Sequence, residues 1–511
     1  MAPLTGRKLI YTINFVAGLA IFFFGYDQGM MGGVNTAPNY VELMDLGYAT
    51  YEGKNEGWVA TITNTPKQGG IVSVYYLGTL IGALIAGVMG DRIGRIKTMF
   101  HGSLWVCFGA ALQCSSQNLA WILCARIING IGTGYLNAVV PVWSAEVSSH
   151  KSRGAFIAME FTLNIFGVVV AYWLSYGLGY IDEGASQFRW RFPMAFQLVP
   201  ITIFMFSLHW MPESPRWLLK VGKEEEAKEV LQRLRADDEN PAQAESELRD
   251  IADVVGLELK HRKMNNYWNM FWGIGDGDLH VARRVQLAIW LQIIQEWTGI
   301  AAITAPVIFT QAGYSSRKSE WVSGLNDITY MFSTVLATYT IDRWGRRIGL
   351  WWGAVGQGIS MFLAGGFSRL LKDHPDQASQ YGGAATLFVF LYTAIFGATW
   401  LDIPWVYPTE IYPLQVRAKG NALGVVGWSI GNGWLMMLNP VMFSKIAENT
   451  FYIFAAVNFA SIPIVWAFYP ETANRTLEEL DILFSAKSPF TWDAEKRFKE
   501  ARASPSVSTS I

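Results

Sequence analysis

Charged and reactive residues are scarce in this chain of 511 residues, and their scarcity excludes several classes of protein. Asp, Glu, Lys and Arg make up 16% of the residues, against about 25% in soluble domains, which argues against an ordinary soluble protein. The net charge is −1, so no nucleic-acid partner is indicated. Three cysteines in one apolar region give neither a disulfide framework nor metal-ligand spacing. With six histidines and no nucleophile–base pair, we expect neither an enzyme nor a metal or other cofactor.

The chain is rich instead in long apolar stretches, with 51% hydrophobic residues. A transmembrane helix needs about 20 mainly apolar residues. Twelve stretches meet this need, near residues 9–31, 72–90, 99–117, 120–144, 155–179, 191–211, 284–312, 321–341, 349–368, 385–408, 419–442 and 450–469. We therefore predict an all-α membrane protein that crosses the lipid bilayer twelve times.

A charged turn between two apolar runs occurs twice in the chain. The first copy is Asp91-Arg92-Ile-Gly94-Arg95 and the second is Asp342-Arg343-Trp-Gly345-Arg346. Each copy is followed by a glutamate seven residues before an arginine, and then by a Pro-Glu pair near an arginine. These later markers are Glu146 with Arg153, Glu410 with Arg417, Glu213 with Arg216, and Glu471 with Arg475. Ordered markers that occur twice indicate a duplicated unit, so we predict two pseudo-symmetric six-helix bundles.

The region between the bundles is different in character. Residues 223–235 and 242–263 have the pattern of amphipathic, charged helices. We therefore divide the chain into an N-terminal bundle, a helical linker, a C-terminal bundle and a tail, at residues 1–212, 213–282, 283–470 and 471–511. The clusters of Lys and Arg all fall on one side of this arrangement, which makes that side, both termini, the linker and the tail cytoplasmic. Residues 32–70 are expected to form a polar loop on the opposite side.

An acidic residue, Asp27, lies inside the first apolar stretch. A carboxylate inside a membrane span costs about 2.5–3.5 kcal/mol, so it needs a partner or a water-filled cavity. Arg126, in the fourth stretch, is the basic residue well inside a span of the same half, and we predict an Asp27–Arg126 pair. The pair has two interpretations: a proton-coupling device whose carboxylate responds to the approach of the arginine, or a static ion pair.

The charged turns also have two interpretations. Their charges can pair with neighbouring carboxylates and helix ends and latch the cytoplasmic face shut in one conformation, or they can serve as topology anchors. The predicted gate consists of Asp91, Arg92, Arg95, Glu146, Arg153, Glu213, Arg216, Asp342, Arg343, Arg346, Glu410, Arg417 and Glu471.

Polar and aromatic residues gather in the seventh, tenth and eleventh stretches, which predicts a pocket in the second half. Glu296 and Asp402 are further acids within these stretches. Gly299 and Pro306 permit a broken helix near the middle of the membrane, where transporter binding sites lie.

The motifs described above, with the segments from Phe24-Gly-Tyr-Asp27 to Pro470-Glu-Thr472, resemble the sugar porter family of the major facilitator superfamily, especially its fungal members. The resemblance implies two bundles that work by alternating access in the plasma membrane. It also implies a monomeric carrier for a sugar or polyol, without a cofactor. Family members that use protons keep an aspartate at the position of Asp27, and Arg126 matches its usual partner, so the resemblance favours proton symport.

The resemblance also assigns a substrate site, and some of its positions match the family. The matching residues are Phe24, Gln295, Phe396, Trp405 and Asn432.

Other positions of that site depart from the family, which has amides at four of them where this chain has Phe161, Glu296, Tyr330 and Trp428. Ala301, Ala305 and Pro306 also replace polar or tyrosine positions. A pocket with fewer amides and more rings leaves an unusual sugar, a polyol or a less polar metabolite as substrate. A nutrient sensor without transport is a third interpretation, which the short tail disfavours.

Overall fold

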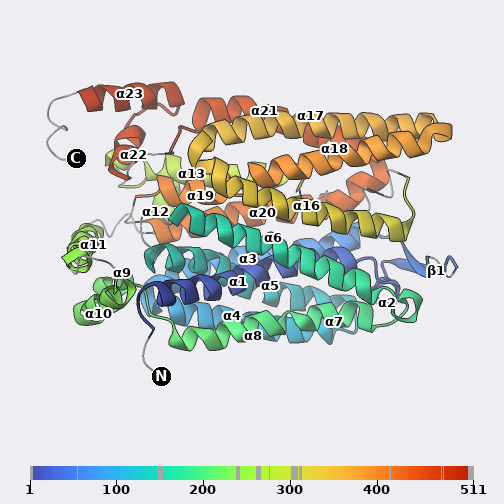
Figure 1. Ribbon diagram of the computed structural model, residues 1–511, viewed down its shortest axis with the longest axis horizontal. Helices are drawn as coiled ribbons and strands as arrows, with labels where there is room; N and C mark the ends of the chain where they lie inside the picture. The colour runs from blue at the N-terminus through green and yellow to red at the C-terminus, as the bar shows by residue number, and fades with distance from the viewer. Residues whose placement is uncertain are drawn as a thin grey trace.

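The computed structural model describes residues 4–53, 56–147, 153–236, 242–260, 266–275, 277–300, 309, 313–413, 416–473, 475 and 477–503. Helices form two stacked bundles, with the N-terminal half in blue to green and the C-terminal half in yellow to red (Figure 1). Helices α9, α10 and α11 lie at one end of the molecule, called here the insert end. A β-hairpin lies at the other, called here the hairpin end (Figure 1).

The N-terminal bundle contains the first six predicted spans. Its helices are α1 (Gly6–Val34), α3 (Thr65–Ile93), α4 (Arg95–Cys114), α5 (Leu119–Val147), α6 (Arg153–Leu178), α7 (Phe188–Phe196) and α8 (Leu198–Ser207). The sixth span is divided between α7 and α8. Pro200 has no N–H to donate to the carbonyl of Phe196, which accounts for the interruption at this point.

The C-terminal bundle repeats this plan. Its helices are α13 (Val281–Trp297), α16 (Ser316–Trp344), α17 (Arg346–Asp373), α18 (Ala378–Ala398), α19 (Ile403–Ile411), α20 (Arg417–Ile446) and α21 (Asn449–Phe468). The seventh span ends early as a regular helix, because Gly299 has φ of +115°. Residues 301–308, with Pro306, lie outside the described part. The tenth span, predicted as one helix, is two helices separated at residues 399–402, and Pro404 stands in the first turn of α19.

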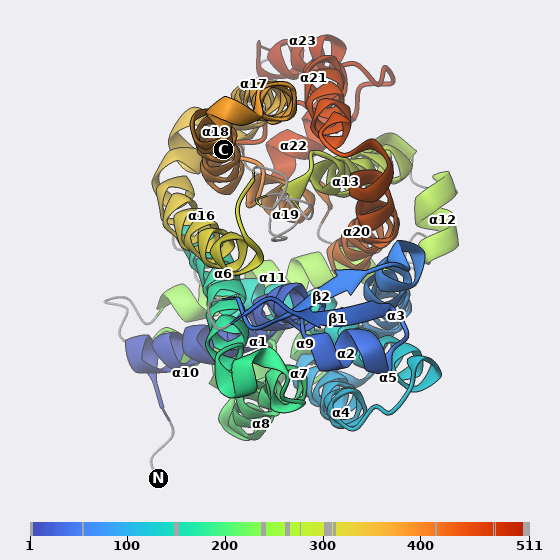
Figure 2. The same ribbon diagram turned by 90° about the vertical axis from the view of Figure 1, so that its right-hand side faces the viewer.

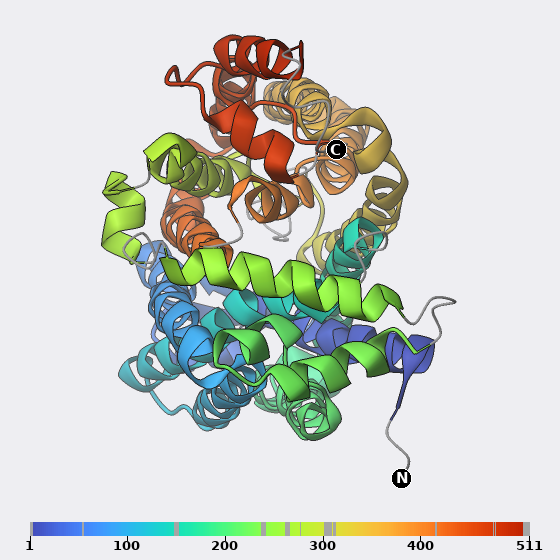
Figure 3. The same cartoon turned by 90° about the vertical axis from the view of Figure 1, so that its left-hand side faces the viewer.

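Shorter elements occupy the two ends. The insert end has α9 (Pro215–Lys220), α10 (Glu224–Leu234), α11 (Ala242–Lys260) and α12 (Tyr267–Trp272), so both amphipathic helices of the linker are confirmed. The predicted tail contains α22 (Leu477–Phe484) and α23 (Thr491–Ala503). Figure 3 looks at this end, where the green helices of the insert lie across the N-terminal bundle. Single 3₁₀ turns are η1 (Ile181–Gly184), η2 (Leu208–Trp210), η4 (Gly277–Leu279) and η5 (Pro375–Gln377).

The prediction of a loop over residues 32–70 was wrong. This segment contains α2 (Pro38–Leu43) and two antiparallel strands, β1 (Gly47–Tyr51) and β2 (Trp58–Ile62), with Tyr51 opposite Trp58. Tyr, Thr, Val and Trp, which favour strands, dominate both strands, and this short signal is weaker than a membrane-span pattern. Figure 2 looks at the hairpin end, where the strands lie over α1 and α6 beside the C-terminal bundle.

The helices fit a bilayer. Within the described residues, seven helical segments are long and apolar enough to cross a membrane by length and composition. They are 6–34, 65–93, 119–147, 159–178, 188–210, 375–411 and 449–468. Helices α4, α13, α16, α17 and α20 occupy the other five span positions. Several of these begin or end in charged residues, as α17 does at Arg346 and Arg347, which lowers their average hydropathy.

Each bundle has its own hydrophobic core, and the two cores interlock. Ala422, Val425 and Trp428 of α20 join the core of the N-terminal bundle. Phe161, Ile165 and Val168 of α6 join that of the C-terminal bundle. The contact between the bundles therefore runs along α3–α20 and α6–α16, and the candidate site lies between them.

Candidate functional site

The structure places Asp27 of α1 beside Arg126 of α5, with both side chains buried. Arg126 Nη1 lies 3.4 Å from Asp27 Oδ1, and Asn129 Nδ2 donates to the same oxygen at 3.2 Å. The guanidinium also lies 4.3 Å from the centre of the Tyr75 ring. The sequence analysis missed Asn129, although it follows Arg126 by about one helical turn and so shares its helix face.

The geometry leaves the Asp27 carboxylate loosely held. A strong arginine–carboxylate bond measures about 2.7–2.9 Å and often joins two pairs of atoms. Here the ion pair has a single contact at 3.4 Å. Such a carboxylate can exchange its arginine partner for a proton at lower cost than a bidentate pair can.

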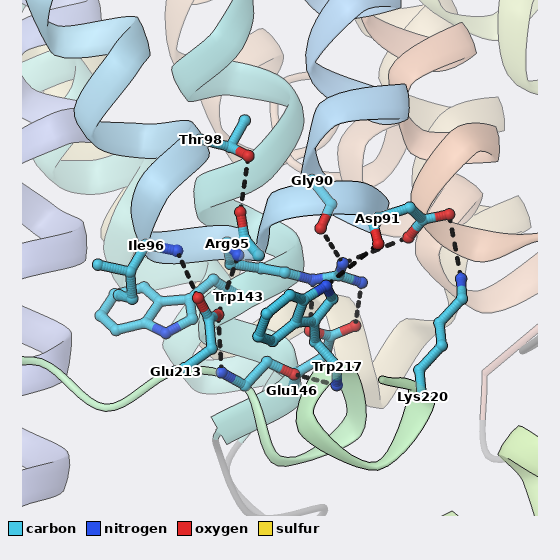
Figure 4. Close-up of polar contacts among 12 residues, drawn as sticks. Gly90, Asp91, Arg95, Ile96, Thr98, Trp143, Glu146, Glu213, Trp217 and Lys220 are labelled. Carbon is cyan, nitrogen blue, oxygen red and sulfur yellow. Dashed lines mark hydrogen bonds and ion pairs between the residues drawn. The ribbon is translucent and has the colours of Figure 1, made fainter. Parts of the chain in front are cut away.

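The charged turn of the N-terminal half forms a network at the insert end (Figure 4). The Arg95 guanidinium donates twice to Glu146, through Nε and Nη2 at 3.0 Å each, and once to Asp91 Oδ1 at 3.3 Å. Lys220 Nζ lies 3.1 Å from Asp91 Oδ2. The network joins α3, α4, α5 and α9.

Glu213 holds the start of α4 in this network (Figure 4). Its carboxylate accepts the backbone N–H groups of Arg95, at 2.9 Å, and Ile96, at 3.1 Å. These two groups belong to the first turn of α4, which lacks intrahelical acceptors. Burial raises the pKa of Glu213, while these backbone donors act in the opposite direction.

The second half repeats this arrangement. Arg346 Nη2 lies 2.6 Å from Glu410 Oε1, and Thr472 Oγ1 donates to the other oxygen of Glu410 at 2.6 Å. Glu471 accepts the backbone N–H groups of Arg346, at 2.8 Å, and Arg347, at 3.0 Å. Glu471 is thus the counterpart of Glu213 at the start of α17.

Gly94 and Gly345 make both turns sterically feasible. Their φ values are +96° and +88°, in a region that L side chains rarely adopt. A Cβ on Gly94 would meet the carboxylate of Glu213, and a Cβ on Gly345 would meet that of Glu471. The repeated glycine therefore permits both the turn and the approach of the capping glutamate.

Two further gate arginines also interact with their surroundings. Arg216 acts electrostatically on Glu146, and Arg417 Nη2 donates to the carbonyl of Tyr412 at 3.4 Å. The side chains of Arg92 and Arg343 are exposed. The side chains of Arg153 and Asp342 lie outside the described part of the chain.

Four of the predicted substrate residues form an aromatic cluster between the bundles. Phe24 contacts Trp428 and Trp405, with ring centres 5.2 and 6.4 Å apart. Phe161 lies 5.5 Å from Trp405, and the two tryptophans lie 6.0 Å apart. Phe24 and Phe161 come from the N-terminal bundle, and Trp405 and Trp428 from the C-terminal bundle. This ring cluster therefore closes the space between the bundles.

The acid Glu296 lies beside the ring cluster. Its carboxylate interacts with the side chains of Asn432 and Trp428. The structure therefore brings three predicted substrate residues together.

Gln295 has a different environment. Its Nε2 donates to the carbonyls of Trp400, at 2.8 Å, and Leu401, at 2.9 Å, in the interruption between α18 and α19. Its amide thus supplies hydrogen bonds to two carbonyl groups at the break in the tenth span. Tyr330 and Phe396 form a separate ring pair, 5.9 Å apart.

A cavity of about 410 Å³ opens on the hairpin side of the ring cluster. Its wall includes Arg126, Tyr75 and Tyr76, and the Tyr76 ring contacts Trp428 at 5.3 Å, so cavity and cluster adjoin. None of the nine predicted substrate residues is among the described residues that line it.

Asp327 of α16 also lines this cavity, and the sequence analysis missed it. An acid inside an apolar run is the same signal that identified Asp27, so the sequence contained the clue.

Two interlocked six-span helical bundles with a cavity between them define a membrane transporter with the fold of the major facilitator superfamily. The chain matches the family model described as "Sugar (and other) transporter" over residues 13–484. It belongs to this family, so it is a carrier rather than an enzyme.

Known proteins resemble the chain along nearly its whole length. "Sugar transporter STL1" of Saccharomyces cerevisiae is 32% identical over 489 residues, which cover 94% of this chain and 82% of that protein. "MFS-type transporter oryC" of Aspergillus oryzae is 31% identical over 484 residues, covering 94% and 86%. The structure of the proton:xylose symporter XylE of E. coli bound to 6-bromo-6-deoxy-D-glucose has a TM-score of 0.75 at 24% identity. It covers 94% of this chain and 100% of that chain.

Proposed function

We propose that this carrier imports a sugar or related polyol, together with a proton, across the plasma membrane by alternating access. The observation that carries the proposal is the buried Asp27–Arg126 pair, whose arginine lines a cavity between the bundles. The names of relatives support it, since one is a sugar transporter and a structural neighbour is a proton:xylose symporter.

In this proposal the insert end faces the cytoplasm, with both termini inside, because the Lys and Arg clusters lie there. Residues 1–212 and 283–470 form the two moving bundles, residues 213–282 the linker, and residues 471–511 the tail. One copy of the chain contributes both walls of the cavity, so a monomer in the lipid bilayer suffices for transport.

Asp27 binds the proton that drives uptake. A proton on Asp27 removes the attraction for Arg126, which lies on the cavity wall and is then free to reorient. The networks around Arg95 and Arg346 hold the insert end in one conformation, and their rearrangement opens that end. A membrane potential of 100 mV supplies about 2.3 kcal/mol per charge, or roughly 50-fold accumulation for one proton.

The substrate site combines Phe24, Phe161, Trp405 and Trp428 with the polar groups of Glu296 and Asn432. Gln295, Tyr330 and Phe396 support it from the surrounding helices. Rings offer flat faces to a sugar ring, and the carboxylate and amide offer hydrogen-bond partners to its hydroxyl groups.

Uptake into proteoliposomes tests the proposal. Purified protein is supplied with hexoses, pentoses, disaccharides and polyols, with and without an inward proton gradient. We expect one or more of these compounds to accumulate only with the gradient. Folded protein that accumulates none of them would overturn the proposal.

A second candidate is a carrier for a less polar metabolite. The mutual packing of four rings favours it, because these rings take up space where a sugar site needs amides. Competition experiments separate the two candidates: excess sugar or polyol reduces uptake of the true substrate only if they share the site.

A further inference from the structure

The cavity at the hairpin side contains a buried acid that the proposed mechanism does not use. Asp327 is fully buried and lines the cavity, and neither oxygen of its carboxylate has a hydrogen-bond partner among the described residues. A buried carboxylate without hydrogen-bond donors is strongly unfavourable. Its position on a cavity wall therefore points to a ligand that supplies donors.

Other groups on the cavity wall also indicate a bound ligand. The side-chain oxygen of Asn439, on α20, is buried and also lacks a hydrogen-bond partner among the described residues. Tyr172, on α6, lines the cavity and interacts electrostatically with Asp327. Groups from both bundles thus surround the same space, and the atoms without a hydrogen-bond partner among the described residues include acceptors, on Asp327 and Asn439, and a hydroxyl, on Tyr172.

The charged residues of the cavity wall indicate whether the ligand is charged or uncharged. Arg126 is paired with Asp27, and Arg189 with Glu320 at 2.9 Å. Asp327 has no such pair among the described residues. An acidic ligand would find both of these arginines already paired, whereas neighbouring hydroxyl groups can each donate to one oxygen of Asp327.

We infer that this cavity is a second binding site, for an uncharged compound with neighbouring hydroxyl groups, and that Asp327 and Tyr172 determine its specificity. The inference rests on the proposed function and places a binding step on the hairpin side of the ring cluster. Asp327 accepts two hydroxyl groups, Asn439 accepts a third, and Tyr172 flanks them. Tyr76 then connects this cavity to the inner site through its contact with Trp428.

Binding measurements in lipid nanodiscs test the inference. Glycerol, xylitol, D-sorbitol, D-xylose and D-glucose are titrated into the wild type and into Asp327→Leu, Tyr172→Phe and Asp45→Asn. Asp45 is the matched control, because it pairs with Lys67 in an exposed position away from the cavity. We expect Asp327→Leu to weaken binding of the preferred compound at least tenfold, since both hydrogen bonds to its carboxyl group are lost. Tyr172→Phe weakens it severalfold, and Asp45→Asn leaves it unchanged.

Thermal melting separates a binding role from a structural one. Leucine has the same branched arrangement of heavy atoms as aspartate, is larger beside an open cavity, and removes an unpaired buried acid, so Asp327→Leu should melt at the wild-type temperature or above it. Weaker binding without a loss of stability supports the inference. If Asp327→Leu does not fold, the affinity of Tyr172→Phe decides.

Three results would overturn the inference, and they can be told apart. Wild-type protein that neither binds nor transports any of the compounds removes the proposed function as well. Wild-type affinities in both cavity variants, with transport of a polyol or sugar intact, overturn the second site alone. Sodium binding that Asp327→Leu abolishes, with polyol affinity unchanged, reassigns the cavity to a cation.

Discussion

At the scale of single residues, Asp27 has the most direct role in coupling. We predict that Asp27→Asn abolishes proton-driven accumulation and retains exchange of substrate across the membrane. Asparagine keeps the shape and the hydrogen bond to Asn129 but cannot gain or lose a proton. Accumulation and counterflow in proteoliposomes measure the two activities separately.

The control for this variant is Asp45→Asn, which removes an exposed acid of the hairpin end and should leave both activities intact. Accumulation by Asp27→Asn at the wild-type level would assign the proton to another acid. Glu160, Glu296, Asp327 and Asp402 are buried acids to test next, because each lies in a membrane-spanning region.

The partner of a buried residue could be predicted from the sequence where a single physical rule determined it. An acid inside an apolar run needs a partner, and this rule led from Asp27 to Arg126. The same rule applies to Asp327, but its carboxyl group has no hydrogen-bond partner among the described residues. A sequence cannot predict that an expected partner is missing. The role of Gln295 was also out of reach, because it depends on the carbonyls of Trp400 and Leu401 in a span that was expected to be continuous.

At the scale of elements, the turns between paired helices depend on glycine. We predict that Gly94→Ala destabilises the protein by about 1–3 kcal/mol, because alanine is strained at φ of +96°. Its Cβ also meets the Glu213 carboxylate, which must then release the N-terminus of α4. Thermal or denaturant unfolding in detergent measures the effect.

Gly70→Ala is the matched control, because Gly70 lies inside α3 and an added Cβ there has no neighbour within 4 Å. It should be neutral or stabilising by roughly 0.5–1 kcal/mol, since alanine favours helices. Equal stability of the Gly94→Ala and Gly70→Ala proteins would show that the turn tolerates a side chain.

Helices were predictable from apolar length, but their interruptions were not. The tenth span is mainly apolar, with the acid Asp402 within it, and its break at residues 399–402 depends on Pro404 and on the amide of Gln295 from another helix. The hairpin of residues 47–62 was missed for a related reason. Two five-residue strands give a weak local pattern, and their pairing is a contact between segments.

At the scale of the whole molecule, the two ends are held in different ways. The Arg95–Glu146 and Arg346–Glu410 pairs at the insert end each lie within one bundle. At the hairpin end, Arg189 of α7 pairs with Glu320 of α16 and so joins the two bundles directly. The duplicated motifs could not predict the ion pairs that join the two bundles. They describe the contacts within each bundle and contain no information on the contacts between the bundles.

This difference leads to a prediction about the conformational equilibrium. Glu320→Gln should shift the protein toward opening at the hairpin end, because it removes an ion pair that joins the two bundles there. Arg189 is buried and Glu320 is 16% exposed, so we expect at least about 1 kcal/mol, or roughly a fivefold change or more in the ratio of open to closed molecules. Distances between spin labels on α2 and η5 measure this ratio by pulsed electron resonance.

Asp373→Asn is the control, because its pair with Arg369 lies within a single helix, α17, and bridges no bundles. This variant should leave the label distances unchanged. Opening is a difference between two states, so an interaction present in both cannot shift their ratio. Identical distances in the wild type and Glu320→Gln would therefore mean that the Arg189–Glu320 pair moves with the bundles. Closure would then depend on the contacts of α3 with α20, where Thr79 and Ser429 lie 2.7 Å apart.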